Sequence, residues 1–252
     1  MKRPIATTLG VIAFSALSAC SEATAPIEEA TRETGWVMPP VVDTATASGR
    51  DLVVSGFAAP LGRVVVRGAG DLAYAVGTDE QGRFDLRVPR PSRDTVFTVE
   101  ARQGQTAYPA PYRLLIGADP QAPVALLAIG APTRRLDGDG GLDAVDTDGR
   151  ATFLSGRATA GATVRIEGMG SRTTSADDQG RWRIAGAGDG ASPIVVDGVA
   201  HTPAPGSGDA VEGGLERAGA GWRITWSSPG AGRQSTWFPD RPERGDVAPT
   251  IG

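Results

Sequence analysis

The chain has 252 residues, which is enough for one large domain or two small ones. Its 35 glycines and 19 prolines favour short strands and tight turns over helices. The formal net charge of -4, with no basic run beyond Arg134-Arg135, argues against nucleic acid as a partner. With Cys20 as the only cysteine, the fold cannot contain an internal disulfide and must rely on its apolar core.

The first 20 residues have the layout of an export signal. Lys2 and Arg3 precede an apolar stretch over residues 5–17, which is shorter than the roughly 20 residues that a membrane-spanning helix needs. The following Leu17-Ser-Ala-Cys20 resembles the lipobox of bacterial lipoproteins. This resemblance implies that residues 1–19 are a lipoprotein signal peptide and that Cys20 receives diacylglycerol and then an N-acyl chain such as palmitate. The alternative is an ordinary signal peptide cleaved after Ala19.

The lipobox also implies a location. Ser21, which follows the cysteine, is a residue that permits passage to the outer membrane in enterobacterial sorting. We therefore expect a protein of the cell envelope that is held by lipid on the outer membrane, on its periplasmic or its outer surface. Residues 20–48 contain few large apolar side chains and are predicted to form the lipidated N-terminus and a flexible tether.

The rest of the chain contains an internal repeat. Residues 50–56 match residues 150–156, and the similarity continues through residues 63–84 and 163–182 with one short deletion. Apolar and polar residues alternate within the matched segments, which is typical of half-buried strands. The repeat predicts two domains, over residues 49–132 and 150–240, the second with an insertion at 206–221. The polar residues 241–252 are predicted to be a disordered tail.

One motif of the repeat predicts a tight turn. Asp79 and Gly82 stand at its first and fourth positions in one copy, as do Asp177 and Gly180 in the other. Aspartate suits the first position because its carboxylate accepts backbone N–H groups, and glycine suits the fourth, where φ is often positive. We therefore interpret both segments as hairpin tips and not as a repeated binding site.

These motifs together suggest a fold class. The order of Ser-Gly, a Val-rich strand, Asp-x-x-Gly and an aromatic strand resembles the immunoglobulin-like repeats of bacterial surface proteins and is similar to carboxypeptidase-regulatory-like β-sandwiches. The resemblance implies an all-β chain with two tandem immunoglobulin-like β-sandwich domains. In these families the domains are stalks, spacers or adhesive modules.

An acidic, Gly-rich segment, residues 133–149, separates the two copies and contains Asp137, Asp143 and Asp148. We interpret it as a linker. The alternative is a calcium loop, but the spacing places Leu142 where an EF-hand has glycine, and Asp148 where it has a bidentate glutamate.

The second copy is rich in tryptophan. Trp222, Trp226 and Trp237 could stack on a sugar or peptide if exposed, although tryptophan in a small domain usually fills the core. His201 is the only histidine and has no partner pattern for a metal site or a triad, so it is interpreted as a rim residue. We predict no catalytic residue, no metal site and no cofactor.

Three functional hypotheses follow. The first is a non-enzymatic cell-envelope lipoprotein, bound to the membrane by the lipid on Cys20, that is an interaction, spacer or adhesive module for an envelope protein or glycan. The second is a glycan- or peptidoglycan-binding lipoprotein that uses the Trp-rich second domain. The third is an envelope hydrolase, which would need two carboxylates that converge in a cleft.

Overall fold

The computed structural model describes residues 38–128, 130–138, 140–206, 211–228 and 232–241. These residues form β-strands joined by turns and contain no helix, which confirms the prediction of an all-β fold. The signal peptide, Cys20 and most of the predicted tether and tail lie outside the described residues. The described part of the chain is one compact unit.

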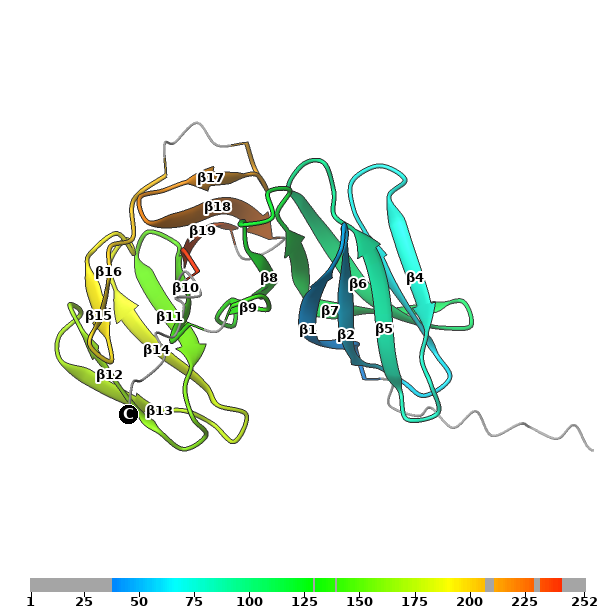
Figure 1. Cartoon of the computed structure of the whole chain (residues 1–252), viewed down its shortest axis with the longest axis horizontal. Helices are drawn as coiled ribbons and strands as arrows, with labels where there is room; N and C mark the ends of the chain where they lie inside the picture. Colours follow the sequence, from blue (N-terminus) through cyan, green and yellow to red (C-terminus); the bar gives the residue numbers. More distant parts are fainter. Residues whose placement is uncertain (1–37, 129, 139, 207–210, 229–231, 242–252) are drawn as a thin grey trace, which may run out of the picture. The chain divides into compact units, whose positions relative to one another are not determined.

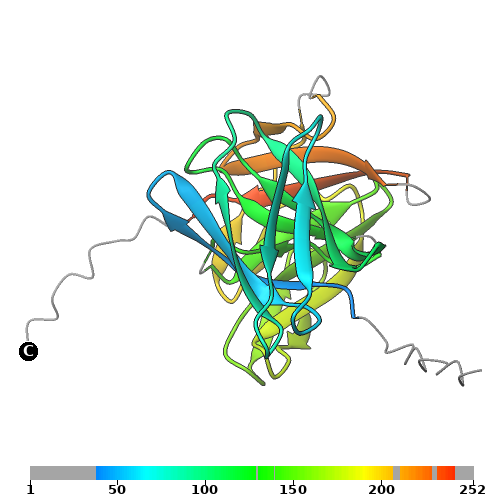
Figure 2. The same ribbon diagram turned by 90° about the vertical axis from the view of Figure 1, so that its right-hand side faces the viewer.

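The first half forms two antiparallel sheets, A and B (Figure 1). Figure 2 turns this half toward the viewer. Sheet A contains, in spatial order, β1 (Val41–Ser48), β2 (Asp51–Phe57) and β5 (Arg83–Pro89). Sheet B contains, in spatial order, β4 (Ala73–Gly77), β3 (Arg63–Arg67), β6 (Thr95–Gln103), β7 (Thr106–Ile116), β8 (Val124–Ala128) and β9 (Arg134–Arg135).

The second half also forms two antiparallel sheets, C and D (Figure 1). Sheet C contains, in spatial order, β14 (Arg181–Ala187), β11 (Ala151–Arg157), β10 (Leu142–Thr147), β19 (Gly232–Pro239), β18 (Gly221–Ser228) and β17 (Leu215–Arg217). Sheet D contains, in spatial order, β13 (Arg172–Ser175), β12 (Thr163–Glu167), β15 (Ile194–Val196) and β16 (Val199–His201).

The repeat seen in the sequence is also a repeat in space. The order β1-β2-β5 recurs as β10-β11-β14, and β4-β3-β6-β7 recurs as β13-β12-β15-β16. One glycine shows why the local sequence is shared. Gly56 lies beneath the ring of Phe84, and Gly156 lies beneath the ring of Trp182. A Cβ at Gly56 would lie 2.0 Å from the Val41 carbonyl oxygen, and a Cβ at Gly156 would lie 1.9 Å from the Gly141 carbonyl oxygen, so neither position has room for a side chain.

The predicted Asp-x-Gln-Gly turns are present in both halves. The Gly82 N–H donates to the Asp79 carbonyl at 3.0 Å, and the Gly180 N–H donates to the Asp177 carbonyl at 2.8 Å. Both glycines have positive φ, 78° and 71°. Each aspartate carboxylate accepts two further backbone N–H groups of its own turn. The turns are not hairpin tips within one sheet, however, because each carries the chain from one sheet to the other.

The four sheets pack as successive layers. One apolar cluster joins sheets A and B, a second joins C and D, and a third joins the other face of B to the other face of C. Sheets B and C are therefore covered on both faces where they meet. This explains why β8 and β10 are buried along nearly their whole length, without the alternation of a half-exposed strand.

The arrangement of four sheets differs from the prediction of two separate immunoglobulin sandwiches. Taken together, the sheets correspond to a four-bladed, propeller-like arrangement. The physical reason is the shared layer between B and C. It contains Leu115 and Leu127 from the first half and Ile224, Trp226 and Phe238 from the second.

The structure corrects the predicted linker. Residues 133–149 contain β9 and β10, and β10 is the first strand of the second repeat. Its residues are buried because β10 pairs with β11 on one side and with β19 on the other. The acidic composition suggested solvent exposure, but the aspartates are held by arginines and hydroxyl groups, as described below.

Two other predicted boundaries also change. The predicted tether ended at residue 48, yet residues 41–48 are β1, and Val42 and Ala45 lie in the core. The predicted insertion, residues 206–221, contains β17, which pairs with β18. The Leu215 N–H donates to the Asp94 carboxylate at 2.9 Å, so the insertion also binds the first half.

Candidate functional site

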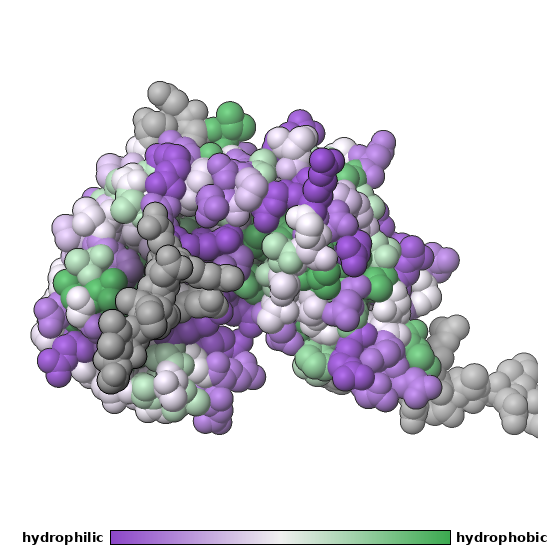
Figure 3. All heavy atoms as spheres, viewed as in Figure 1, coloured by the Kyte–Doolittle hydropathy of each residue, from purple (hydrophilic) through white to green (hydrophobic). Residues whose placement is uncertain are grey.

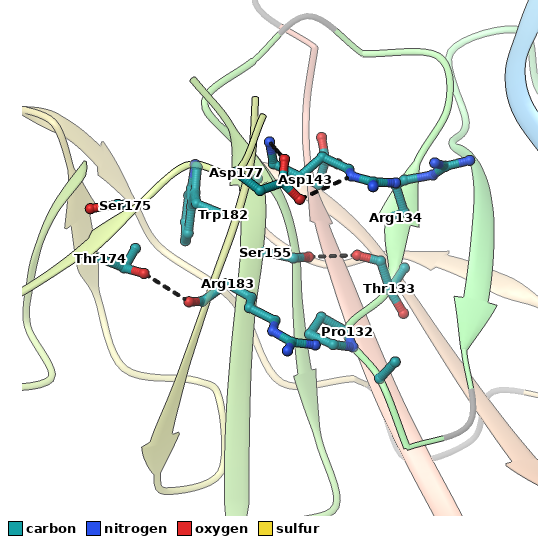
Figure 4. A pocket seen from close by; sticks show the side chains of 13 residues that line it. Pro132, Thr133, Arg134, Asp143, Ser155, Thr174, Ser175, Asp177, Trp182 and Arg183 are labelled. Atoms are coloured by element: carbon teal, nitrogen blue, oxygen red, sulfur yellow. Dashed lines mark hydrogen bonds and ion pairs between the residues drawn. The ribbon is translucent and has the colours of Figure 1, made fainter. Parts of the chain in front are cut away.

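A pocket of about 570 Å³ lies on sheet C, where β11 and β14 face the segment that leads into β9 (Figure 4). Two strands of one repeat thus form one wall, and the chain that joins the repeats forms the other. We call it the arginine pocket and define it by Arg134, Asp143, Ser155, Asp177, Arg181 and Arg183.

The alternation of β14 places two of these arginines. Arg181 and Arg183 stand on one face of the strand, whereas Trp182 and Ile184 stand on the other and pack into the core between C and D. Arg183 is exposed, and its side chain extends toward Pro132 across the pocket (Figure 4). A strand with one apolar face therefore directs its cationic face at the pocket.

The third arginine, Arg134, enters from β9 and is half-buried. Burial lowers its pKa, and the positive charge of Arg181 lowers it further, while Asp43 acts in the opposite direction. One guanidinium nitrogen donates to the Val42 carbonyl, but Nε is buried without a hydrogen-bond partner among the described residues. The Arg134 guanidinium thus has an incomplete set of hydrogen-bond partners among the described residues.

The two carboxylates of the arginine pocket are already engaged. Asp143 is buried and lies 3.2 Å from Arg157. Burial raises the pKa of this carboxyl, and Arg157 opposes that effect. Asp177 is exposed, binds the backbone of its own turn and lies 3.6 Å from Arg181. The hydrogen bond from the Arg181 N–H is the main reason why the pKa of Asp177 is lowered.

Two hydroxyl groups fix the walls. The Ser155 hydroxyl donates to the Thr133 carbonyl at 2.5 Å and so ties β11 to the segment before β9 (Figure 4). The Thr174 hydroxyl donates to the Arg183 carbonyl at 3.1 Å and covers the free edge of β14. The pocket is therefore built on paired strands and held by hydrogen bonds before any ligand arrives.

This arrangement can bind an anion. Three arginines and two aspartates line the pocket, and both aspartates have arginine partners. Arginine suits carboxylate and phosphate groups because its planar guanidinium can donate two parallel hydrogen bonds. The chemistry that the pocket supports is recognition of a carboxylate or phosphate group.

The structure separates the three tryptophans proposed for ligand stacking. Trp226 and Trp237 are 2% and 1% exposed. Their indole N–H groups donate to Thr236 and to the Ala218 carbonyl. Neither ring offers a face to a ligand, because each fills a layer between two sheets. Stacking on these two residues is therefore not available.

Trp222 is the exception among the three. It is half-buried, and the Arg217 guanidinium covers its ring, 4.8 Å from the centroid. Asp240 in turn holds Arg217 through two hydrogen bonds. A ligand would have to displace this arginine to stack on the ring.

The aspartates of the predicted linker are dispersed and do not form a calcium loop. Asp137 binds Arg135 and Arg241, and Asp148 accepts the N–H groups of its own turn. Asp146 is buried and accepts hydrogen bonds from threonine side chains. In the described part of the chain, no three His, Cys, Asp or Glu side chains lie close enough to hold a metal ion.

His201 ends β16 and is half-buried. Burial lowers its pKa, which favours the neutral ring. It lies at the rim of a smaller hollow of about 340 Å³ beside Val199 and Arg241. The position agrees with its interpretation as a rim residue.

Comparison with known proteins gives no matching family model and no matching curated protein. No helix of the described residues is long and apolar enough to cross a membrane. Cys20, the predicted lipidation site, lies outside the described residues.

The arginine pocket was not predicted from the sequence. Arg181 and Arg183 were visible as the polar face of a strand, which is a weak signal because most strands have one. The decisive contribution is that of Arg134, which belongs to the segment interpreted as a linker. Only the pairing of β9 with β8 brings it to the pocket.

Proposed function

We propose that this chain is a non-enzymatic lipoprotein of the cell envelope, anchored through Cys20, whose folded part binds a partner through an anionic group. The observation that carries the proposal is the arginine pocket, in which the positive charge is in excess and both carboxylates have arginine partners. The partner would be an envelope protein or glycan that presents a carboxylate or phosphate.

A binding role fits the state of the ionisable groups better than hydrolysis does. A general acid and base must face the substrate. Asp143 is held by Arg157, and Asp146 is enclosed by Thr133 and Thr236, so both have structural partners. The third hypothesis, a hydrolase with two converging carboxylates, gains no support from this arrangement.

We also infer that each repeat is an immunoglobulin-like sandwich and that the two are fused face to face. Each repeat has a three-stranded sheet packed against a four-stranded sheet in the same order. Seven strands in two packed sheets is the layout of such domains. Strands β8 and β9 then extend sheet B, and β17 to β19 extend sheet C, which supports the fusion.

The alternative of a glycan-binding lipoprotein loses its original support. It depended on three tryptophans, of which Trp226 and Trp237 are buried. An acidic glycan stays among the ligands that the arginine pocket would accept.

Lipid attachment is tested by Cys20→Ala. Cells fed with a labelled fatty acid should label the natural chain, which should sediment with membranes at its processed size. Cys20→Ala should lose the label and either stay unprocessed or become soluble. A variant that still sediments at the processed size would show that Cys20 is not the anchor.

The arginine pocket is tested by photo-crosslinking in the envelope. A photoreactive residue at Ser175, at the pocket rim, should capture a partner, and Arg183→Glu should abolish that capture. Arg87→Glu is the control, because Arg87 is an exposed strand arginine on sheet A. If Arg183→Glu still captures the partner as well as Arg87→Glu does, the arginine pocket is excluded as the binding site.

A further inference from the structure

Exposed apolar side chains gather at one end of the first half. Among the described residues, seven large apolar side chains are exposed, and four of them lie where the described chain begins and where β2 ends. They form what we call the apolar patch: Met38, Val41, Phe57 and Leu61. Figure 3 shows apolar surface at this end of the first half, beside polar surface.

The patch is built on paired backbone. Val41 and Phe57 are directly opposite each other on β1 and β2, so their side chains lie next to each other on one face of sheet A. Phe57 is 48% exposed. Leu61 follows four residues later, in the turn between β2 and β3, and is 77% exposed. Beside the patch on this face, Ser55 and Asp85 are joined by a hydrogen bond.

The second repeat provides an internal comparison. The position of Phe57, opposite Arg83, corresponds to Arg157, which lies opposite Arg181. The position of Val41 corresponds to Gly141. The Val41 carbonyl faces Gly56 of β2, and the Gly141 carbonyl faces Gly156, the equivalent glycine of β11. The fold therefore does not require apolar residues here, and only the repeat that adjoins the N-terminal segment has them.

Leu61 shows this most clearly. It has a φ of 53°, and the equivalent Gly161 has a φ of 75°. Glycine adopts this conformation readily, whereas a side chain with a Cβ is strained in it. A leucine that is both strained and mostly exposed gains little from packing within its own fold. This combination suggests that the side chain contacts something outside it.

Arginines flank the apolar patch. Arg63 and Arg102 are paired neighbours on β3 and β6, and together with the turn around Leu61 they line a hollow of about 460 Å³. The position of Arg63 is Thr163 in the second repeat. Apolar side chains bordered by arginines match a phospholipid surface, where acyl chains lie beneath anionic phosphates.

We propose that the apolar patch and Arg63 contact the phospholipid bilayer to which Cys20 is anchored. This proposal rests on the proposed lipid anchor. The chain between Cys20 and Met38 could span up to roughly 60 Å if fully extended, so the tether alone allows many distances from the membrane. The patch lies where that chain enters the fold, and its contact would hold the first half against the bilayer with the second repeat free to meet a partner.

Depth-dependent fluorescence quenching tests the proposal. Because Cys20 carries the lipid, a single added cysteine can be labelled specifically. Glu80→Cys and Asp178→Cys form a matched pair, since they are the same exposed position of the Asp-x-Gln-Gly turn in the two repeats. The lipidated full-length chain is reconstituted in anionic vesicles of phosphatidylethanolamine and phosphatidylglycerol that contain a spin-labelled quencher lipid.

The expected result is strong quenching of the label at residue 80 and weak quenching at residue 178. The variant Phe57→Arg/Leu61→Gly, which copies the second repeat, should lower quenching at residue 80 to the level at residue 178. Its melting temperature should be unchanged or higher, because glycine relieves the strain at residue 61. Equal quenching at both positions, or quenching at residue 80 that the variant does not reduce, would overturn the proposal.

The anchor and the patch fail in different ways. If Cys20 carries no lipid, the natural chain will not take up the labelled fatty acid in cells, and the proposed anchor is wrong. The chain is then attached by an N-terminal histidine tag to a nickel-chelating lipid, with Cys20→Ser, and the same pair of labels is compared. A difference between the labels would support the patch alone, and no difference would reject it.

Discussion

The Thr236 hydroxyl on β19 donates a hydrogen bond of 2.7 Å to the Asp146 carboxylate on β10, and both residues are buried. Thr133 donates its N–H and its hydroxyl to the same carboxylate, each at 2.7 Å. The Trp226 N–H donates to Thr236 at 3.2 Å and links the network to the layer between sheets B and C. A carboxyl group is thus buried between β10 and β19, and the hydrogen-bond donors that it has among the described residues are all neutral.

This site predicts an unusual pH dependence. Burial is the largest influence on Asp146 and raises its pKa, although the hydrogen bonds oppose it. A carboxyl whose pKa is raised in the folded state adds stability that is complete below its ordinary pKa of about 4 and is lost as pH rises through the raised value. Relative to Asp146→Asn, the natural chain should therefore gain stability as pH falls from 8 toward 4, measured by urea unfolding.

Asp148→Asn is the matched control. Backbone N–H groups of Ala151 and Arg150 lower the pKa of Asp148, so its contribution has the opposite sign and is lost as pH falls through the lowered value. A stability difference between the natural chain and Asp146→Asn that does not change with pH would show that folding leaves the pKa of Asp146 unchanged.

The shared layer between sheets B and C predicts one unfolding transition and not two. Trp226 fills this layer and is 2% exposed. Trp226→Ala should destabilise the chain by about 3–5 kcal/mol, the usual cost of removing a buried aromatic side chain. Calorimetry should show a single peak for the natural chain. Two peaks, only one of them shifted by the substitution, would mean that the halves unfold independently.

The glycines beneath the aromatic rings predict equal effects in the two repeats. Gly56→Ala and Gly156→Ala each place a Cβ within about 2 Å of a carbonyl oxygen, and overpacking of this kind costs about 1–3 kcal/mol. Gly77→Ala is the control, because Gly77, like Gly56 and Gly156, has no positive φ and a Cβ there would lie no closer than 3.9 Å to another atom. Chemical denaturation of the three variants should place Gly56→Ala and Gly156→Ala well below the control in stability.

Tyr112 predicts a titration that can be observed directly. Burial raises the pKa of its hydroxyl to about 12. The hydroxyl donates to the Pro40 carbonyl at 2.6 Å and accepts the Val42 N–H at 2.9 Å. Tyr112→Phe should remove the transition near pH 12 from an ultraviolet pH titration. It should also destabilise the fold by about 1–2 kcal/mol, because both backbone groups lose their partner.

The sequence was sufficient for what depends on local pattern. The alternation in β5 and β14 and the Asp-x-Gln-Gly turns follow from side-chain period and turn chemistry, which neighbouring residues determine. The repeat also revealed which strands correspond. These features needed no knowledge of how the sheets pack.

The sequence was insufficient where the burial or the partners of a residue depend on a strand or sheet that is distant in the chain. Asp143 and Asp146 suggested a solvated linker, because nothing local shows that Arg157 and Thr236 will meet them across strands. The same limit applied to Trp226, whose burial depends on sheet B covering sheet C. The arginine pocket was missed for this reason, since Arg134 reaches it only through the pairing of β9.

The bond from Tyr112 to Pro40 also has a mechanical consequence. Tyr112 belongs to β7 in sheet B, whereas Pro40 directly precedes β1, the outermost strand of sheet A. If the proposed tether is pulled, tension that arrives at Pro40 passes through this hydroxyl into β7, a strand of sheet B whose last three residues are buried. Part of the force is thereby borne by the Tyr112 hydrogen bond, and β1 is less exposed to sequential rupture of its hydrogen bonds with β2.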